Sequence, residues 1–432
     1  MKTSSALTSI LCVLGIAFGA AGGTLLRAKY ERTASSIVPM GALAESDPRV
    51  PKSLTLLDSG IEPGAYFSYV EGLLTEKFFK DVNDHTALAH GALDEMLAAL
   101  QDPGSQFYYE KAWSGCEKIL QGGAPGIGVD LELAQLPSSQ AMLTKLIVVS
   151  VLDGGSAKDA GVLPKDEIVK IEGRWIVCQE LMREWMAIQR DYAEQRLSVD
   201  QFREQINKFY DRLQTSIPAG DAIEKLLTDS GQPVAITILR NGKLIDVVCK
   251  PKQPNAQLVA ESNGTIRIRA FGQGCANQLA AAIQNKRKLV IDIRCNPGGY
   301  LNEVKQCLSL LIPAGEFAKY QKEPNGELIP MKLDRGTNQP REITLIVDSG
   351  TAREAELFAA ALRDRAKAKL EGGPTFGMGV ALERFDLKDG TGYTLTSAHF
   401  FDLHGKPLVQ AADQKTAFEF SPRISQDEAA IG

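Results

Sequence analysis

The chain opens with a long run of uncharged and mainly apolar residues, TSSALTSILCVLGIAFGAAGGTLL, at positions 3–26. Lys2 precedes this run, and basic residues follow it closely. Because about 20 apolar residues span a bilayer as a helix, we expect residues 1–26 to be an uncleaved signal anchor. A cleaved signal peptide is one alternative, although such peptides usually have a shorter apolar region. A buried core helix is the other. Either of the first two interpretations predicts export to the cell envelope.

The pattern changes twice in the next hundred residues. Residues 27–60 mix Ser, Pro, Gly and charged residues without periodicity, which is typical of a linker. Residues 61–115 place apolar residues at helical spacing, as in TALAHGALDEMLAAL, until a Pro-Gly break in QDPGSQFYY. We therefore expect an N-terminal helical region there.

Residues 116–253 have the pattern of a small β-rich domain. PGIGVDLEL is a Gly-rich entry into a strand, and VAITILRNGKLIDVVC predicts a hairpin that turns at Asn241-Gly242. Residues 181–215 interrupt this pattern with two amphipathic helices, the second opened by a capping box, S-x-x-Q, at Ser198. We expect an inserted helical hairpin. It either packs only on its own domain or serves as a docking or oligomerisation element.

From residue 254 to residue 432, predicted strands alternate with predicted helices. TIRIRAFGQGCANQLAAAIQNKRKLVIDIRCNPGGYLNEVKQCLSLLI reads as strand, helix, strand, Gly-rich turn and helix. Such alternation predicts a mostly parallel sheet. The expected fold is therefore α+β and multidomain: an N-terminal helical segment, a β-rich domain with a helical insertion, and an α/β core.

Composition removes several classes of function. The net charge of -5 and the absence of a basic stripe argue against a nucleic-acid partner. The 4 His residues are scattered, and the 7 Cys residues form no C-x-x-C pair, so we expect neither a metal nor a cofactor. Sequence alone does not decide whether the six cysteines after the N-terminal run form bridges or remain thiols.

The β-rich segment resembles a PDZ domain through GIGV, DGGSAKDAG and DEIVKIEG. The resemblance implies that C-terminal peptides add a strand to its sheet edge and that loop N–H groups capture the carboxylate. Gly126, Ile127, Gly128 and Val129 match that loop and are the predicted peptide-binding residues. A plain turn into a strand would explain GIGV equally simply.

The region from about Tyr66 to Pro407 resembles the tail-specific, or C-terminal processing, serine peptidases of family S41. IDIRCNPGG at 291–299 is the most specific match, and TFGMG, DGTGYTLT and HGKPL extend it. The family uses a Ser nucleophile, a Lys base and usually a Gln that orients the Lys. The resemblance also implies that Gly298 and Gly299 help form an oxyanion hole, although both would also suit a strand-to-helix turn.

The same resemblance predicts a site without its chemistry. The nucleophile motif, G-[ST]-A-S-A-[SA]-E, reads GTAREAE here and places Arg353 where the Ser belongs. Met378 replaces the Lys of T-F-G-K-G, and Leu382 occupies the Gln position. A guanidinium and a thioether are neither nucleophile nor base at neutral pH. We expect no catalytic residue at these positions, and we expect Arg353 to pair with Glu354 or Glu356.

A displaced dyad is the alternative. Ser349 and Thr351 are hydroxyls on the same turn, and Lys367 and Lys369 follow it. A shift of two residues re-aims a side chain by far more than catalysis tolerates. The sequence therefore favours a catalytically inactive member of the family.

The predicted function is that of an exported, membrane-anchored pseudopeptidase that binds peptide C-termini or unfolded segments. It would act as a scaffold, or as partner of an active S41 peptidase or of further copies of itself. Two alternatives remain: an active endopeptidase with a displaced nucleophile, and a structural envelope protein whose helical hairpin drives assembly.

Overall fold

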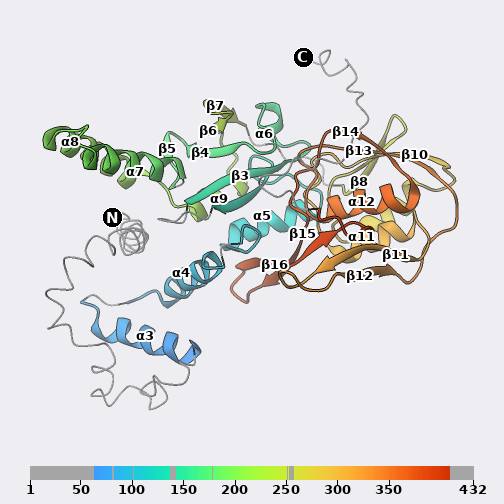
Figure 1. Ribbon diagram of the computed structural model, residues 1–432, viewed down its shortest axis with the longest axis horizontal. Coiled ribbons are helices and arrows are strands. Elements are labelled where there is room, and N and C mark those ends of the chain that lie inside the picture. The colour runs from blue at the N-terminus through green and yellow to red at the C-terminus, as the bar shows by residue number, and fades with distance from the viewer. Residues whose placement is uncertain are drawn as a thin grey trace. The chain divides into compact units, whose positions relative to one another are not determined.

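The computed structural model describes residues 63–79, 82–100, 102–136, 143–177, 179–250, 252 and 257–408 (Figure 1). The predicted signal anchor, the predicted linker and the segment after Leu408 lie outside these residues. Across the described ranges, no helix combines the length and the apolar character needed to cross a membrane.

The described chain falls into two units. The first contains α3 (Pro63–Lys77) and most of α4 (His85–Ala98), which are the helices predicted for the N-terminal region. The second begins at Leu97 and contains every other described element. It includes residues 102–115, which the sequence analysis had assigned to the N-terminal helical region.

An antiparallel sheet, here named the β2–β7 sheet, forms the first part of the second unit. Its strand order is β2-β3-β4-β6-β7, with β5 paired to β4. The strands are β2 (Val129–Leu136), β3 (Leu143–Val151), β4 (Glu167–Ile171), β5 (Arg174–Trp175), β6 (Val234–Arg240) and β7 (Lys243–Cys249). Three helices accompany it: α5 (Glu110–Leu120), α6 (Ser156–Asp159) and α9 (Ala219–Leu227). The predicted hairpin is confirmed, because β6 and β7 pair around Asn241 and Gly242 and both turn residues have positive φ.

The helical insertion predicted within this region is present. It consists of α7 (Gln179–Ala193) and α8 (Val199–Thr215), which pack against each other. The capping box at Ser198 is confirmed, since its side chain accepts from the Gln201 N–H and the Gln201 side chain accepts from the Ser198 N–H. At the hairpin tip, the rings of Tyr192 and Phe202 stack with centroids 4.2 Å apart.

The mostly parallel sheet predicted for the C-terminal third is also present. Its order is β14-β13-β10-β9-β8, parallel except for the β8–β9 pair. The strands are β8 (Val259–Ser262), β9 (Thr265–Ile268), β10 (Lys288–Asp292), β13 (Glu342–Val347) and β14 (Lys369–Gly372). The helices are α10 (Cys275–Ala282), α11 (Leu301–Ser309) and α12 (Glu354–Ala366). Apolar strands such as KLVID and EITLIV fit a sheet whose faces are buried.

A further sheet, here named the β16 sheet, was not predicted from the sequence. Its order is β1-β16-β11-β12, with β15 paired to β16. The strands are β1 (Gln106–Tyr108), β11 (Gly315–Gln321), β12 (Ile329–Leu333), β15 (Val380–Asp386) and β16 (Gly392–Phe401). Helix α12 contacts both β13 of the parallel sheet and β11 of this one. Helix α12 therefore lies between the parallel sheet and the β16 sheet.

Candidate functional site

The turn between β13 and α12 carries the residue at the nucleophile position. Arg353 precedes α12 and has φ 54 and ψ -121, which is a strained conformation for a residue with a side chain. Local hydrogen bonds hold the turn: the Thr351 hydroxyl donates to the Ile293 carbonyl at 2.9 Å, and the Gly350 N–H donates to Asp348 at 3.0 Å. The turn thus keeps the sharp strand-to-helix geometry that typically exposes a nucleophile.

A single buried carboxylate brings the two dyad positions together. Glu356 Oε2 accepts the backbone N–H groups of Arg353 at 3.1 Å, Met378 at 2.9 Å and Gly379 at 2.9 Å. Its other oxygen accepts the Gly377 N–H at 2.7 Å. Four N–H donors around one carboxylate form a strong, charge-assisted network. The loop that carries position 378 is therefore fastened to the turn that carries position 353.

The Arg353 side chain leaves this turn and reaches β2. Its Nη1 lies 2.6 Å from Asp130 Oδ2 and donates to the Pro297 carbonyl at 3.1 Å. Its Nη2 lies 3.5 Å from Glu132 Oε2. The Arg353 and Glu132 residues are only 8% and 7% exposed, so these ion pairs are shielded from solvent. We name this set of three side chains the Arg353 clamp.

The expected pairing of Arg353 with Glu354 or Glu356 is wrong for the side chain. Glu356 receives only the backbone N–H of Arg353, and Glu354 receives backbone N–H groups from elsewhere. The strained backbone at Arg353 aims the guanidinium away from its own helix and toward the β2–β7 sheet. Two carboxylates more than 200 residues away in the sequence replace the neighbouring ones as partners.

The clamp holds one cation against two carboxylates. Burial opposes the charge on Arg353, but Asp130 and Glu132 overcome this effect and raise the guanidinium pKa above its usual value. Burial raises the pKa of Glu132 to about 7, and Arg353 only partly offsets that rise. Asp130 is the nearer partner and therefore provides the main counter-charge, while Glu132 is largely protonated below neutral pH.

Glu354 occupies the backbone N–H groups next to the dyad positions. Its Oε2 accepts from the Gly299 N–H at 3.1 Å, and its Oε1 accepts from the Leu382 N–H at 3.3 Å. The Gly298 N–H donates to Asn296 Oδ1 at 2.9 Å. Both N–H groups assigned to an oxyanion hole are therefore engaged within the chain. Burial raises the pKa of Glu354 to about 6, against the effect of these backbone donors.

Gly298 and Gly299 have a clear conformational role in the turn. Their φ values are 100 and 144, a region that favours glycine. A Cβ on Gly299 would lie 2.5 Å from the Phe271 carbonyl oxygen, and a Cβ on Gly298 would collide with the Glu354 carboxylate. Glycine at both positions lets the strand-to-helix turn pass close to its neighbours.

Comparison with known proteins identifies this arrangement. Residues 262–415 match the sequence profile of Peptidase family S41. This segment of the chain is S41-like. Curated relatives include proteins described as probable CtpA-like serine proteases: one from Staphylococcus saprophyticus is 24% identical over 78% of this chain, and one from Staphylococcus aureus is 25% identical over 78%. The chain spans 62% of the length of both relatives.

A solved structure of a C-terminal processing protease has a similar fold. The chain titled photosystem II D1 C-terminal processing protease superposes with a TM-score of 0.52 at 18% sequence identity. The match covers 80% of this chain and 84% of that one.

The positions predicted for the base and its orienting Gln hold apolar side chains. Met378 has a thioether side chain and Leu382 an aliphatic one. Leu382 also lies close to Gly104, because a Cβ added at Gly104 would come within 2.7 Å of Leu382 Cδ2. Because Gly104 precedes β1, the Gln position of the family is packed against the segment that enters the β16 sheet. An apolar residue fits this contact.

The alternative dyad of the S41-type site finds no support in the geometry. Thr351 is fully buried, and its hydroxyl is committed to a backbone carbonyl. Lys367 directly follows α12, and Lys369 begins β14. Helix α12, with 13 residues and a length of about 20 Å, therefore separates both lysines from the turn at Arg353 along the chain. Lys369 pairs with Glu371 at 2.6 Å. Ser349 is half-buried on the turn, without a lysine from this pair in reach.

The predicted carboxylate loop of the β2–β7 sheet is closed in this structure. Gly126, Ile127 and Gly128 donate their N–H groups to Asp229 Oδ1, the Leu226 carbonyl and the Pro125 carbonyl, at 2.8, 3.0 and 2.9 Å. The loop and Val129 are buried. A Cβ at Gly126 would collide with the Leu226 carbonyl of α9, so glycine is needed there for packing. A peptide carboxylate could use this loop only after these donors were released.

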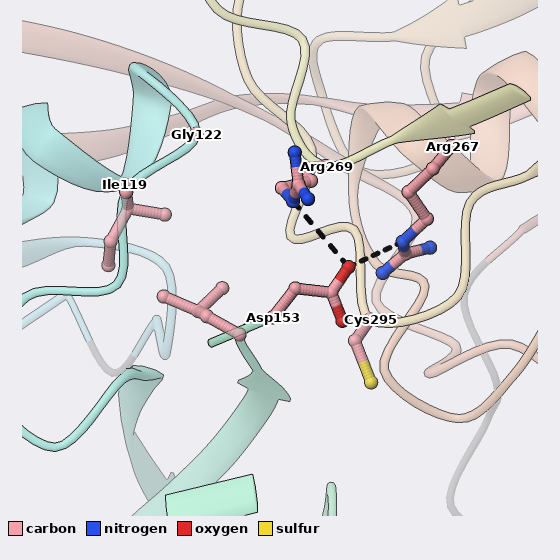
Figure 2. Close-up of a pocket in the computed structure, with 8 residues that line it drawn as sticks. Ile119, Gly122, Asp153, Arg267, Arg269 and Cys295 are labelled. Atoms are coloured by element: carbon pink, nitrogen blue, oxygen red, sulfur yellow. Dashed lines mark hydrogen bonds and ion pairs between the residues drawn. The ribbon is translucent and has the colours of Figure 1, made fainter. Parts of the chain in front are cut away.

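A second group of charges joins the β2–β7 sheet to the parallel sheet (Figure 2). It lines a small pocket together with Ile119, Gly122 and Cys295. Asp153, which follows β3, lies 2.6 Å from Arg267 Nε of β9 and 3.6 Å from Arg269 Nε. Burial would raise the pKa of Asp153, but Arg267 and Lys158 hold it at about 2. This contact therefore remains ionised near pH 7, where Glu132 changes its charge.

Sequence reasoning missed two features of the site. Glu354 stands where the family motif has Ala, and this acidic replacement was a visible signal for a carboxylate that fills the site. Asp130 and Glu132 lie in the strand after GIGV as alternating acids, which is an ordinary pattern for a half-exposed strand. Their contact with Arg353 could not be read from the sequence, because it joins separate sheets.

Proposed function

We propose that this S41 member does not hydrolyse peptides and acts by binding them. The Arg353 clamp carries the proposal: the nucleophile position holds a buried cation tied to the β2–β7 sheet. Met378 supplies no base, and Glu354 fills the Gly299 N–H that would stabilise an oxyanion. Loss of either dyad member should lower the rate by several orders of magnitude. The fold and the family support polypeptide segments as the ligands.

The binding role extends to the β2–β7 sheet as a PDZ-type module. The order of strands, the Gly126–Val129 loop and helix α9 support a site at which a peptide C-terminus adds to the sheet edge. The internal hydrogen bonds of the loop imply that such binding requires α9 to release Ile127. Export, membrane anchoring through residues 3–26, and action as a scaffold or partner of an active S41 peptidase belong to the same proposal.

The test compares cleavage of unfolded β-casein by the purified full chain with cleavage by restored variants. We expect no cleavage by the wild type above a mock preparation. Arg353→Ser with Met378→Lys should remain inactive, because Glu354 still occupies the Gly299 N–H. Adding Glu354→Ala and Leu382→Gln should produce measurable activity if the remaining scaffold is intact.

Two outcomes would contradict this function. Cleavage by the wild type that disappears in Ser349→Ala or Thr351→Ala would show a displaced nucleophile. Failure of the wild-type chain to retain unfolded β-casein at all, in a pull-down with the purified protein, would remove the binding role. The single variant Lys367→Ala serves as a control. It should alter neither the cleavage nor the retention of β-casein.

A further inference from the structure

Strand β2 contacts Arg353, the residue at the predicted nucleophile position, through two acidic side chains. It stands at one end of the strand order of its sheet and pairs there with β3 alone. Two of its side chains, Asp130 and Glu132, both reach the same guanidinium, although a β-bulge follows Asp130. In an extended chain, residues two apart lie on one face. Strand β2 therefore presents an acid-x-acid face to Arg353.

The clamp leaves part of its hydrogen-bonding capacity unused. Among the described residues, Arg353 Nε and Glu132 Oε2 are buried without a hydrogen-bond partner. Asp130 is held through Nη1 only, whereas a guanidinium can bind a carboxylate through two parallel N–H groups. A buried donor without a partner is costly. An external carboxylate could therefore satisfy Arg353 more fully than β2 does.

The backbone at Arg353 supports a receptor role for this side chain. Its φ of 54 and ψ of -121 are a strained conformation for a residue with a side chain. The turn is nevertheless held by the Glu356 network described above. The turn fixes the Cα–Cβ direction of Arg353, and the Pro297 carbonyl accepts from Nη1, so the guanidinium is held at one place.

We propose that Arg353 is a carboxylate-binding group for extended acidic peptides, and that β2 occupies it as an intramolecular competitor. The ligand class is a peptide segment with acidic side chains two residues apart. This inference rests on the proposed peptide-binding function and assigns its specificity. Opening requires β2 to leave the Arg353 clamp, while the Asp153–Arg267 contact can continue to join the sheet to the S41 domain.

The probe is the peptide Val-Asp-Leu-Glu-Leu-Ala, which copies residues 129–134, labelled with fluorescein. Its matched control is the neutral peptide Val-Asn-Leu-Gln-Leu-Ala. Binding is measured by fluorescence anisotropy on the full chain, the double variant Asp130→Asn with Glu132→Gln, and Arg353→Met. The double variant removes the internal competitor but keeps the receptor.

We expect the double variant to bind the acidic peptide at least tenfold more tightly than the wild type does, because an attached competitor acts at millimolar effective concentration. It should prefer the acidic peptide over the neutral one by about tenfold, as charge-assisted hydrogen bonds exceed neutral ones. Arg353→Met should bind both peptides alike.

Equal binding of both peptides by the double variant would overturn the inference. If circular dichroism shows that the double variant is unfolded, the single variant Asp130→Asn, which keeps Glu132 as counter-ion, replaces it. That variant should still bind the acidic peptide at least threefold more tightly than the wild type, and no difference would also overturn the inference. Retention of uncleaved β-casein without any charge preference would reject acidic specificity while leaving the proposed function standing.

Discussion

Removing the cation from the Arg353 clamp should destabilise the protein far more than removing a surface charge. In Arg353→Met, Asp130 and Glu132 would remain buried without their counter-ion. Breaking a buried ion pair from one side costs about 3–5 kcal/mol. At pH 8, which is above the pKa of about 7 of Glu132, we expect the free energy of unfolding to fall by that amount.

The magnitude follows from the geometry of the clamp. The 2.6 Å contact to Asp130 and the 3.5 Å contact to Glu132 lie in a shielded site, so little solvent screening weakens them. The neutral triple variant, Arg353→Met with Asp130→Asn and Glu132→Gln, removes all three charges. It should recover most of the loss, because a buried charge cluster is often no more stabilising than neutral residues of similar size.

Urea unfolding followed by tryptophan fluorescence measures these differences, provided that the m-value is unchanged. The matched control is the exposed pair of Lys288 and Glu342, whose atoms lie 3.0 Å apart with side chains 82% and 70% exposed. Lys288→Met should cost less than about 1 kcal/mol. A loss of similar size in Arg353→Met and Lys288→Met, or a triple variant as unstable as Arg353→Met, would refute the reasoning.

Three further predictions concern the charges around Arg353 and the packing of the Gly126–Val129 loop. Burial raises the pKa of Glu132 to about 7 and of Glu354 to about 6, so the folded state binds more protons than the unfolded chain. The free energy of unfolding should therefore fall as the pH rises from about 4.5 to about 7, by about 3 kcal/mol for Glu132 alone. Urea titrations at several pH values should show a smaller fall in Glu132→Gln. Glu356→Gln should cost about 3 kcal/mol or more by thermal unfolding, since one amide oxygen cannot accept four N–H groups. Gly126→Ala should destabilise the chain more than Gly231→Ala, because both have positive φ but only the first Cβ meets a backbone atom; equal melting temperatures would contradict this.

Several elements could be predicted from the sequence because their causes are local. The Asn241-Gly242 turn, the capping box at Ser198 and the strands that flank IDIRCNPGG depend on residue types at short spacing. The same is true of the S41 motif positions, which lie in continuous segments. Chemical loss at Arg353 and Met378 was visible for that reason.

Long-range pairing could not be predicted. Strand β1 joins β16 across nearly 300 residues, with Phe107 opposite Tyr393, and no local pattern specifies that partner. The boundary of the N-terminal region was placed after β1 for the same reason. Gln106–Tyr108 is too short to be predicted as a strand from its own residues.

The sequence by itself determined which side chains occupy the predicted dyad positions, and the reactivity of each side chain follows from its residue type. Only the tertiary structure decided which groups meet around these positions. The partners of Arg353 come from β2, and the Gly299 N–H is filled by Glu354, because folding places separate sheets and one helix N-terminus around a common point. Charge pairing over such sequence distances depends on position in space, and that position is set by the packing of the whole unit.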